Sequence, residues 1–271
     1  METARAALDA ALVRRAAARS REHAGQLIAE GRVRVGGRVA GKAATQVDLA
    51  AAVVVDTADA GPEYVSRGGH KLAGALAAFS GLKVEGRHCL DAGASTGGFT
   101  DVLLRAGAAH VYAVDVGYGQ LAWSLRTDDR VTVLEQVNIR NLTPEMLGAP
   151  DVPPPDLVVG DLSFISLRLV LEPIKRCVAP GADYALMVKP QFEVGKERVG
   201  AGGVVRDPAL RAEAVRDVAG HAAELGLGVA GVVASPLPGP SGNVEYFLWL
   251  RAGEPPLDEA ALEKAIAEGP Q

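Results

Sequence analysis

Four charged residues stand at places in the sequence where charge is costly to bury. They are Lys71 in SRGGHKL, Asp161 at the end of the apolar run DLVVGD, Lys189 at the end of the apolar run YALMVK, and Glu245 inside GNVEYFLWL. Buried charges usually need partners, so we expect the two lysines to pair with the two carboxylates. A lysine beside a hydroxyl can stabilise the developing alkoxide, or accept its proton if the lysine is neutral. The set therefore suits transfer of an activated group to a hydroxyl, although each residue alone could be an ordinary surface charge.

A glycine-rich stretch, DAGASTGGFT at residues 91–100, is the second feature that could do chemistry. It follows an apolar strand and precedes a helix, which is the context of a nucleotide-binding loop. The dinucleotide pattern G-x-G-x-x-G is only partly met, because Ser95 takes its second glycine position, and no Walker A lysine follows. The loop therefore favours a ligand without phosphate, and the alternative is a purely structural turn.

Two acids complete the predicted cofactor site. Asp115 ends the next strand, 22 residues after Gly93, a position suited to a ribose diol. Asp91 can take an ammonium group or order water, and the helix that follows the loop can bind a carboxylate at its N-terminus. These features favour S-adenosylmethionine over NAD. The predicted cofactor-binding residues are Asp91, Gly93, Ala94, Ser95, Thr96, Gly97, Gly98, Phe99, Thr100, Asp115 and Asn138.

The elements that must position these residues alternate between strands and helices. Strands are predicted over 88–93, 110–117, 131–136, 156–164 and 184–192, and helices over 70–79, 99–107, 119–126, 165–178 and 209–226. This order predicts an α/β domain of Rossmann type, with a parallel sheet covered by helices on both faces. Two last strands, over 227–237 and 244–252, are close enough to pair antiparallel at one edge. Ligands of such sheets bind beyond the carboxyl ends of the strands, where Asp161 and Lys189 should project.

The N-terminal part reads as a separate small α+β module. A helix is predicted over 6–17, with Leu8, Leu12 and Val13 on one side. A second helix is predicted from an N-cap at Ser20 to Gly31, with Ala24, Leu27 and Ile28 as its apolar stripe. A hairpin around Gly36-Gly37 and a strand over 51–56 follow, and the segment DTADAGPEY is a plausible linker.

Charge is distributed unevenly along the chain. The formal net charge is −5, but residues 10–45 carry about +6, which leaves about −11 for the rest. This asymmetry suggests a basic module attached to an acidic one and predicts contact with RNA, although a solvated charged face is the alternative. The predicted RNA-binding residues are Arg14, Arg15, Arg19, Arg21, Arg32, Arg34, Arg38 and Lys42, together with Arg67 and Lys196 further along.

Several classes of protein are disfavoured. No apolar run approaches the ~18 residues that a membrane helix needs, and METARAALDAALVRR lacks the apolar core of a secretion signal. Cys89 and Cys177 are too few and too far apart for a disulfide framework or a zinc site, so we expect two core thiols and no metal. We expect a cytoplasmic protein.

The motifs resemble those of the TlyA family, also called hemolysin A-like ribosomal RNA methyltransferases. The matching stretches are SRGGHKL, DAGASTGGFT, DVGYGQLAW, DLSFIS, KPQFEVGK and PSGNVEYFLWL, which run in family order between about Leu8 and Arg251. The large domain resembles FtsJ-type 2′-O-methyltransferases, which implies a catalytic tetrad at Lys71, Asp161, Lys189 and Glu245. The N-terminal part resembles an S4 RNA-binding domain.

The resemblance implies S-adenosylmethionine-dependent methylation of cytidine 2′-hydroxyls in ribosomal RNA. Family members with extra residues at both ends act on both ribosomal subunits, and ALDAALVRR and the tail beyond Arg251 resemble this longer form. One departure is PEYV at residues 62–65, where longer members carry a basic-aromatic linker. The expected domains are an S4-like domain over 1–60, a linker over 61–66, a methyltransferase domain over 67–254 and a helix or tail over 255–271.

The alternatives are a non-catalytic RNA-binding or ribosome-assembly factor, a methyltransferase for another acceptor such as tRNA or protein, and a membrane-active hemolysin. Phe192, Tyr118 and Trp123 are candidates for stacking on a nucleotide pulled from its helix, but core packing is the more usual role for each. The target nucleotide, the protonation role of Lys189 and the oligomeric state are left open.

Overall fold

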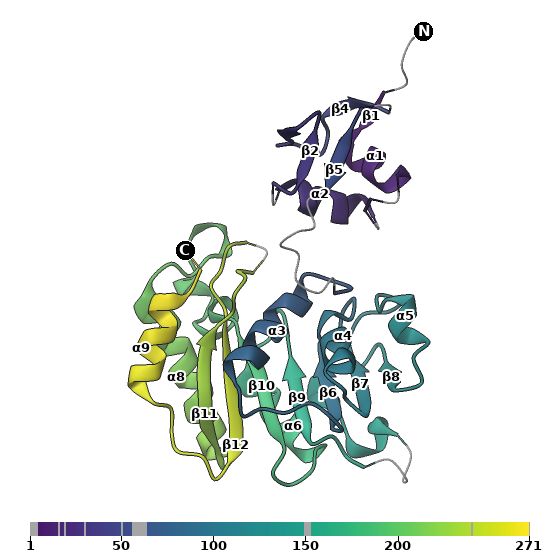
Figure 1. Ribbon diagram of the computed structural model, residues 1–271. Coiled ribbons are helices and arrows are strands. Elements are labelled where there is room, and N and C mark those ends of the chain that lie inside the picture. Colours follow the sequence, from purple (N-terminus) through teal and green to yellow (C-terminus); the bar gives the residue numbers. More distant parts are fainter. Residues whose placement is uncertain are drawn as a thin grey trace. The chain divides into compact units, whose positions relative to one another are not determined.

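A computed structural model describes residues 5–15, 17–18, 20–29, 31–49, 51–55, 64–148, 153–239 and 241–270. The chain divides into two compact units, residues 1–63 and residues 64–271, which are described separately here. Figure 1 shows the elements of both units.

The N-terminal unit packs two helices against small antiparallel sheets. Its helices are α1 (Leu8–Arg14) and α2 (Arg21–Ala29). One sheet has the order β3 (Arg38–Val39), β2 (Val33–Val35), β5 (Val53–Val55), and the other pairs β1 (Arg5–Ala7) with β4 (Gln46–Asp48). The predicted apolar stripes form its core, with Leu8, Leu12, Leu27 and Ile28 buried.

The second helix and the hairpin confirm their predictions. Ser20 Oγ accepts a hydrogen bond from the amide of His23 at 3.1 Å, as an N-cap should, and Gly31 ends the helix with φ +69°. Gly36 and Gly37 both have positive φ, as a two-residue type I′ turn requires.

The first helix is shorter than the predicted 6–17. Residues before Leu8 form β1, which pairs antiparallel with β4, and the amide of Leu8 donates to the carbonyl of Thr45 at 2.8 Å. Strands of three residues are too short to show an alternating pattern, so neither was predicted. The predicted linker residues 56–63, like Arg19, lie outside the described residues.

The large unit is built on one seven-stranded sheet in the order β11-β12-β10-β9-β6-β7-β8 (Figure 1). The strands are β6 (His88–Ala92), β7 (His110–Val114), β8 (Val131–Leu134), β9 (Leu157–Gly160), β10 (Asp183–Val188), β11 (Leu227–Ala234) and β12 (Tyr246–Ala252). Strands β6 to β10 pair parallel, and β12 runs antiparallel to both β10 and β11. The predicted α/β class and its antiparallel edge are confirmed.

Helices cover both faces of this sheet because its inner strands are apolar on both sides. Alternate residues of β10 divide between two cores: Leu186 packs with α6 (Leu171–Arg176), α8 (Pro208–Glu224) and α9 (Glu259–Glu268). Met187 packs on the opposite face with α3 (Gly68–Ala78), α4 (Gly98–Arg105) and α5 (Trp123–Arg126). The remaining helix α7 (Pro190–Glu193) and the short 3₁₀ turns Ile139–Asn141, Pro144–Leu147, Leu167–Leu169, Lys196–Arg198 and Ala201–Gly203 lie in connections.

Two predicted helices are shorter than expected. The helix predicted from Gly119 is reduced to α5, since Gly119 has φ +69°, which an α-helix excludes. The helix predicted over 165–178 splits into the 3₁₀ turn Leu167–Leu169 and α6. Pro173 has no amide hydrogen and is tolerated only in a first turn, so α6 begins just before it.

The two cysteines are core thiols, as expected. Both are buried, and burial raises the pKa of Cys89 to about 12 and that of Cys177 to about 11. None of the helices within the described ranges is long and apolar enough to cross a membrane.

Candidate active site

The four charged residues come to one edge of the large sheet. Asp161 directly follows β9 and Lys189 directly follows β10, so both lie at the carboxyl ends of parallel strands. Glu245 directly precedes β12 and is not inside it as the sequence suggested. Because β12 is antiparallel, with Tyr246 opposite Val188, its beginning lies at that same edge. The fourth residue, Lys71, comes from α3.

Lys71 and Glu245 form a buried ion pair. Lys71 Nζ donates to Glu245 Oε2 at 2.5 Å, and both side chains are almost completely buried. Lys71 Nζ also lies 4.0 Å from Met187 Sδ. The second carboxylate oxygen of Glu245, Oε1, is buried without a hydrogen-bond partner. A buried acceptor of this kind is costly unless something binds to it.

Lys189 pairs with Asp161 but directs its hydrogen bond elsewhere. Lys189 Nζ lies 2.6 Å from Asp161 Oδ1, yet that oxygen has no aligned hydrogen bond. The aligned bond from Nζ goes to Ser163 Oγ at 2.8 Å. The sequence did not single out Ser163; its only signal was its position two residues beyond a charged strand end.

The glycine-rich loop turns sharply between β6 and α4. Gly93 has φ +85°, Ser95 +48° and Gly97 +99°, so three of its residues are left-handed. A Cβ added at Gly97 would overlap Leu125, and one added at Gly98 would overlap Ser66. The glycines are therefore required partly because other segments of the protein pack closely on the loop, a reason that the sequence interpretation missed.

The two predicted acids hold this loop in place. Asp115 accepts hydrogen bonds from the amides of Ser95 at 2.8 Å and Gly117 at 2.7 Å. Asp91 is fully buried and accepts a hydrogen bond from Thr100 Oγ1 at 2.7 Å, while its Oδ1 lacks a partner. Burial raises the pKa of Asp91 to about 7, and the nearby charge of Asp161 adds to this rise.

The other predicted cofactor residues take different positions. Ala94 is buried and Thr96 is exposed, and Phe99 packs on Phe247 in the core, with ring centroids 6.0 Å apart. Asn138 is exposed and caps the 3₁₀ turn that follows it by accepting from the amide of Arg140. Its side chain thus already has a local structural role.

An exposed aromatic residue directly follows Ser163, the residue that Lys189 contacts. Phe164 is 90% exposed and has φ +63°, a strained conformation for a bulky residue. Its ring centroid lies 5.2 Å from that of Phe192, on the helix α7 that begins just after Lys189. Tyr118 and Trp123 are about three-quarters exposed, so core packing was the wrong expectation for both.

Glu193 joins the two segments that carry these residues. Its buried carboxylate accepts from Ser166 Oγ at 2.5 Å and from the amide of Leu167 at 2.8 Å. Arg168 Nε lies 3.6 Å away. Burial raises the pKa of Glu193 despite these bonds. The sequence interpretation missed this clamp, because nothing in KPQFE marks its acid as buried.

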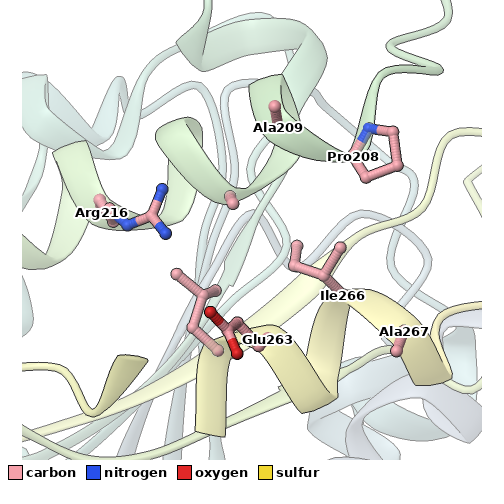
Figure 2. A pocket seen from close by; sticks show the side chains of 8 residues that line it. Pro208, Ala209, Arg216, Glu263, Ile266 and Ala267 are labelled. Carbon is pink, nitrogen blue, oxygen red and sulfur yellow. The ribbon is translucent and has the colours of Figure 1, made fainter. Parts of the chain in front are cut away.

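A cavity of about 450 Å³ lies between α8 and α9 (Figure 2). Its walls are mostly apolar and include Ala209 and Ile266, with Arg216 at the side. None of the tetrad or loop residues lines it. Among the residues with described coordinates, there is no group of three His, Cys, Asp or Glu side chains suited to a metal ion.

Both units of the chain match known protein families. Residues 64–252 match the FtsJ-like methyltransferase family and residues 8–53 match the S4 domain. The chain is 59% identical to the 16S/23S rRNA (cytidine-2′-O)-methyltransferase TlyA of Mycobacterium tuberculosis, over 98% of this chain and 99% of that protein. This chain belongs to the TlyA family.

Other family relatives carry different names. The chain is 36% identical to the 23S rRNA (cytidine-2′-O)-methyltransferase TlyA of Campylobacter jejuni, over 69% of this chain and 70% of that protein. It is 40% identical to Hemolysin A of Brachyspira hyodysenteriae, over 68% of this chain and 75% of that one. A solved structure from Streptococcus thermophilus, also named as a hemolysin, matches with a TM-score of 0.77 and 35% identity, over 98% of this chain and 96% of that one.

The basic residues of the S4 domain fall into two groups. Arg14, Arg34, Arg38 and Lys42 are exposed. Arg15 is half-buried and donates to the carbonyl of Leu49 at 2.6 Å, whereas Arg21 is exposed but pairs with Asp9 at 2.9 Å. Arg32 is also half-buried. In the large unit, Arg67 and Lys196 are both exposed.

Breaking the buried pair from one side should be costly. We expect Glu245→Gln or Lys71→Met alone to lower the free energy of unfolding by about 3–5 kcal/mol, because each leaves a buried charge without its partner. The double variant should recover most of that loss. Both tryptophans, Trp123 and Trp249, lie in the large unit, so urea unfolding followed by fluorescence reports on it. If the losses in free energy of unfolding of the two single variants add up in the double variant, the pairing is contradicted.

Asp91 should make stability depend on pH. Its folded pKa of about 7 is raised from the ordinary 3.8. Between these values the folded state binds a proton that the unfolded state releases, so stability falls as pH rises. Asp91→Asn should therefore be more stable than the parent at pH 8, by up to about 4 kcal/mol, with the difference shrinking toward pH 4. Thermal unfolding at both pH values checks this, with the exposed Asp129→Asn as control; equal differences at the two values would refute it.

Proposed function

We propose that this chain transfers the methyl group of S-adenosylmethionine to the 2′-hydroxyl of a cytidine in ribosomal RNA. One observation carries the proposal: two lysines pair with two carboxylates at the sheet edge beside the glycine-rich loop. Near-full-length similarity to a protein named for this reaction supports it. In this proposal residues 1–60 bind RNA, residues 67–254 carry the chemistry, and the chain acts in the cytoplasm.

The residues of the loop fit this cofactor. The buried and unpartnered Oδ1 of Asp91 suits a group that brings positive charge or a donor. The carboxylate of Asp115, fixed by two amides, suits a ribose diol. When bound, S-adenosylmethionine supplies a methyl group that its sulfonium has already activated. The protein must therefore orient the acceptor hydroxyl and manage one proton.

In this proposal, Lys189 is the side chain that interacts with the proton of the acceptor hydroxyl. It is buried beside Asp161, where little water competes for its Nζ. As a neutral amine it accepts the hydroxyl proton, and as an ammonium ion it stabilises the developing alkoxide. The unpartnered Oε1 of Glu245 can accept a hydrogen bond from the same ribose, and Lys71 holds that carboxylate in position.

Other contacts suit an RNA substrate. The exposed cations of the S4 domain can neutralise phosphates without reading sequence. Phe164 and Phe192 pair their rings close in sequence to Ser163 and Lys189, and a base removed from its stack could rest on them. A methyl acceptor without a nucleobase would have no group to stack on these rings.

Tyr64 and Val65, the described residues of the altered PEYV stretch, pack on the methyltransferase domain. The amide of Val65 donates to Asp101 Oδ2 at 2.9 Å. Tyr64 is buried, with its ring centroid 5.2 Å from the Arg105 guanidinium and 5.1 Å from the His70 ring. The aromatic residue of the linker, Tyr64, is thus anchored although the stretch PEYV lacks a basic residue. Similarity to a relative named for both 16S and 23S rRNA supports the proposal that the chain acts on both ribosomal subunits.

The direct test is transfer of labelled methyl from S-adenosylmethionine to purified 30S and 50S subunits. We expect label in RNA from both, resistant to alkaline cleavage at the modified position. Lys189→Ala should lower the rate roughly 100-fold or more, and Lys83→Ala, at an exposed site, should not. Label in 50S alone would restrict the proposal to one subunit. Cofactor binding without label in either would overturn it.

The hairpin cations should set the salt dependence of RNA binding. Arg34 and Arg38 lie on the paired strands β2 and β3 and are both exposed. Replacing both with Ala should weaken binding to ribosomal subunits and reduce the slope of log affinity against log salt by about 1.5, if each meets one phosphate. The double variant Lys83→Ala/Lys264→Ala removes the same charge elsewhere. Equal slopes for the two variants would exclude the hairpin from the RNA interface.

A further inference from the structure

The aligned hydrogen bond of Lys189 goes to a residue outside the tetrad. Lys189 Nζ donates to Ser163 Oγ at 2.8 Å. Its contact with Asp161 Oδ1 is short, at 2.6 Å, but does not form an aligned hydrogen bond. The carboxylate of Asp161 therefore stabilises Lys189 by its charge, whereas the hydroxyl of Ser163 sets the orientation of the N–H bonds at Nζ.

The orientation of Nζ decides whether its lone pair can face the substrate, because a lysine nitrogen has tetrahedral geometry. A neutral amine has two N–H bonds and one lone pair, arranged tetrahedrally with the bond to Cε. If only one acceptor is present, the lone pair can occupy either of the two remaining positions. Ser163 accepts a hydrogen bond from one N–H, and the charge of the Asp161 carboxylate attracts a second N–H toward it, which leaves a single position for the substrate hydroxyl. The same position carries the third N–H when the group is an ammonium ion.

The segment that carries Ser163 is held in place. Its next residue, Phe164, has a left-handed backbone, and the carboxylate of Glu193 accepts hydrogen bonds from Ser166 and Leu167 just beyond. Glu193 lies on α7, directly after Lys189 and its strand. The clamp thus ties the segment of Ser163 to the segment of Lys189, which fixes the distance between the two side chains.

We propose that Ser163 is a positioning residue for Lys189. Its hydroxyl accepts a hydrogen bond from Nζ and turns the remaining position of that nitrogen toward the acceptor hydroxyl. Ser163 is itself exposed, so its contribution lies in this bond and not in core packing. The inference rests on the proposed methyl transfer, because it assigns Ser163 a part in the same site.

The test compares Ser163→Ala with Ser163→Thr, which keeps the hydroxyl. Single-turnover methyl transfer is measured with saturating cofactor and ribosomal subunits. Loss of a hydrogen bond to a charged group should slow Ser163→Ala about tenfold, while Ser163→Thr should stay within about twofold of the parent. Dissociation constants for the cofactor and the subunits, and the melting temperature, should be unchanged in both variants. Ser80→Ala, at another exposed serine, is the matched control.

The outcomes separate this inference from the proposed function. No transfer by the parent protein would overturn the methyltransferase proposal itself. Transfer by the parent with an unchanged or faster rate in Ser163→Ala would overturn only the role of Ser163. A slow Ser163→Ala whose cofactor or subunit affinity falls in proportion would also overturn it, since the residue would then serve binding and not the position of Lys189.

Discussion

The site depends on one electrostatic constraint: charges at the edge of an apolar sheet must be paired. Lys71 and Glu245 are removed from water almost completely, and each is tolerable only because of the other. Lys189 is nearly as buried, beside the partly exposed Asp161. This pairing keeps two cations and two anions close together, ready to meet a polar substrate that brings further hydrogen-bonding groups.

The topology of the sheet brings these charges together. Parallel strands β9 and β10 end at the same edge, so Asp161 and Lys189 become neighbours although they are far apart in sequence. A further parallel strand would begin at the opposite edge. Because β12 runs antiparallel, its first residues, and Glu245 before them, lie beside the end of β10. The antiparallel direction of β12 is thus required to bring Glu245 to the same edge as Asp161 and Lys189.

Much of this could be predicted from the sequence, for physical reasons. Charges that directly follow apolar runs pointed to the tetrad, and long apolar strands alternating with helices pointed to the fold. Ser163 and Phe164 were missed because they lie in an irregular segment, where side-chain direction follows from backbone angles that have no periodic pattern. Glu193 was missed because α7 is only one turn long, too short to show a helical pattern. The exposure of Tyr118 and Trp123 was missed for the same reason, since the helix expected there is only one turn long. Strands β1 and β4 were too short to leave a signal.

The position of β12 has a consequence for the synthesis of the protein. This strand lies between β10 and β11, although it follows both in the chain, and the partners Lys71 and Glu245 are 174 residues apart. While the chain emerges from the ribosome, the place between β10 and β11 stays open and Lys71 lacks the carboxylate of Glu245. Contacts of such long sequence separation form late and slowly. The charged edge is therefore assembled after most of the domain has been made, so an incomplete chain carries the glycine-rich loop without the rest of the candidate site.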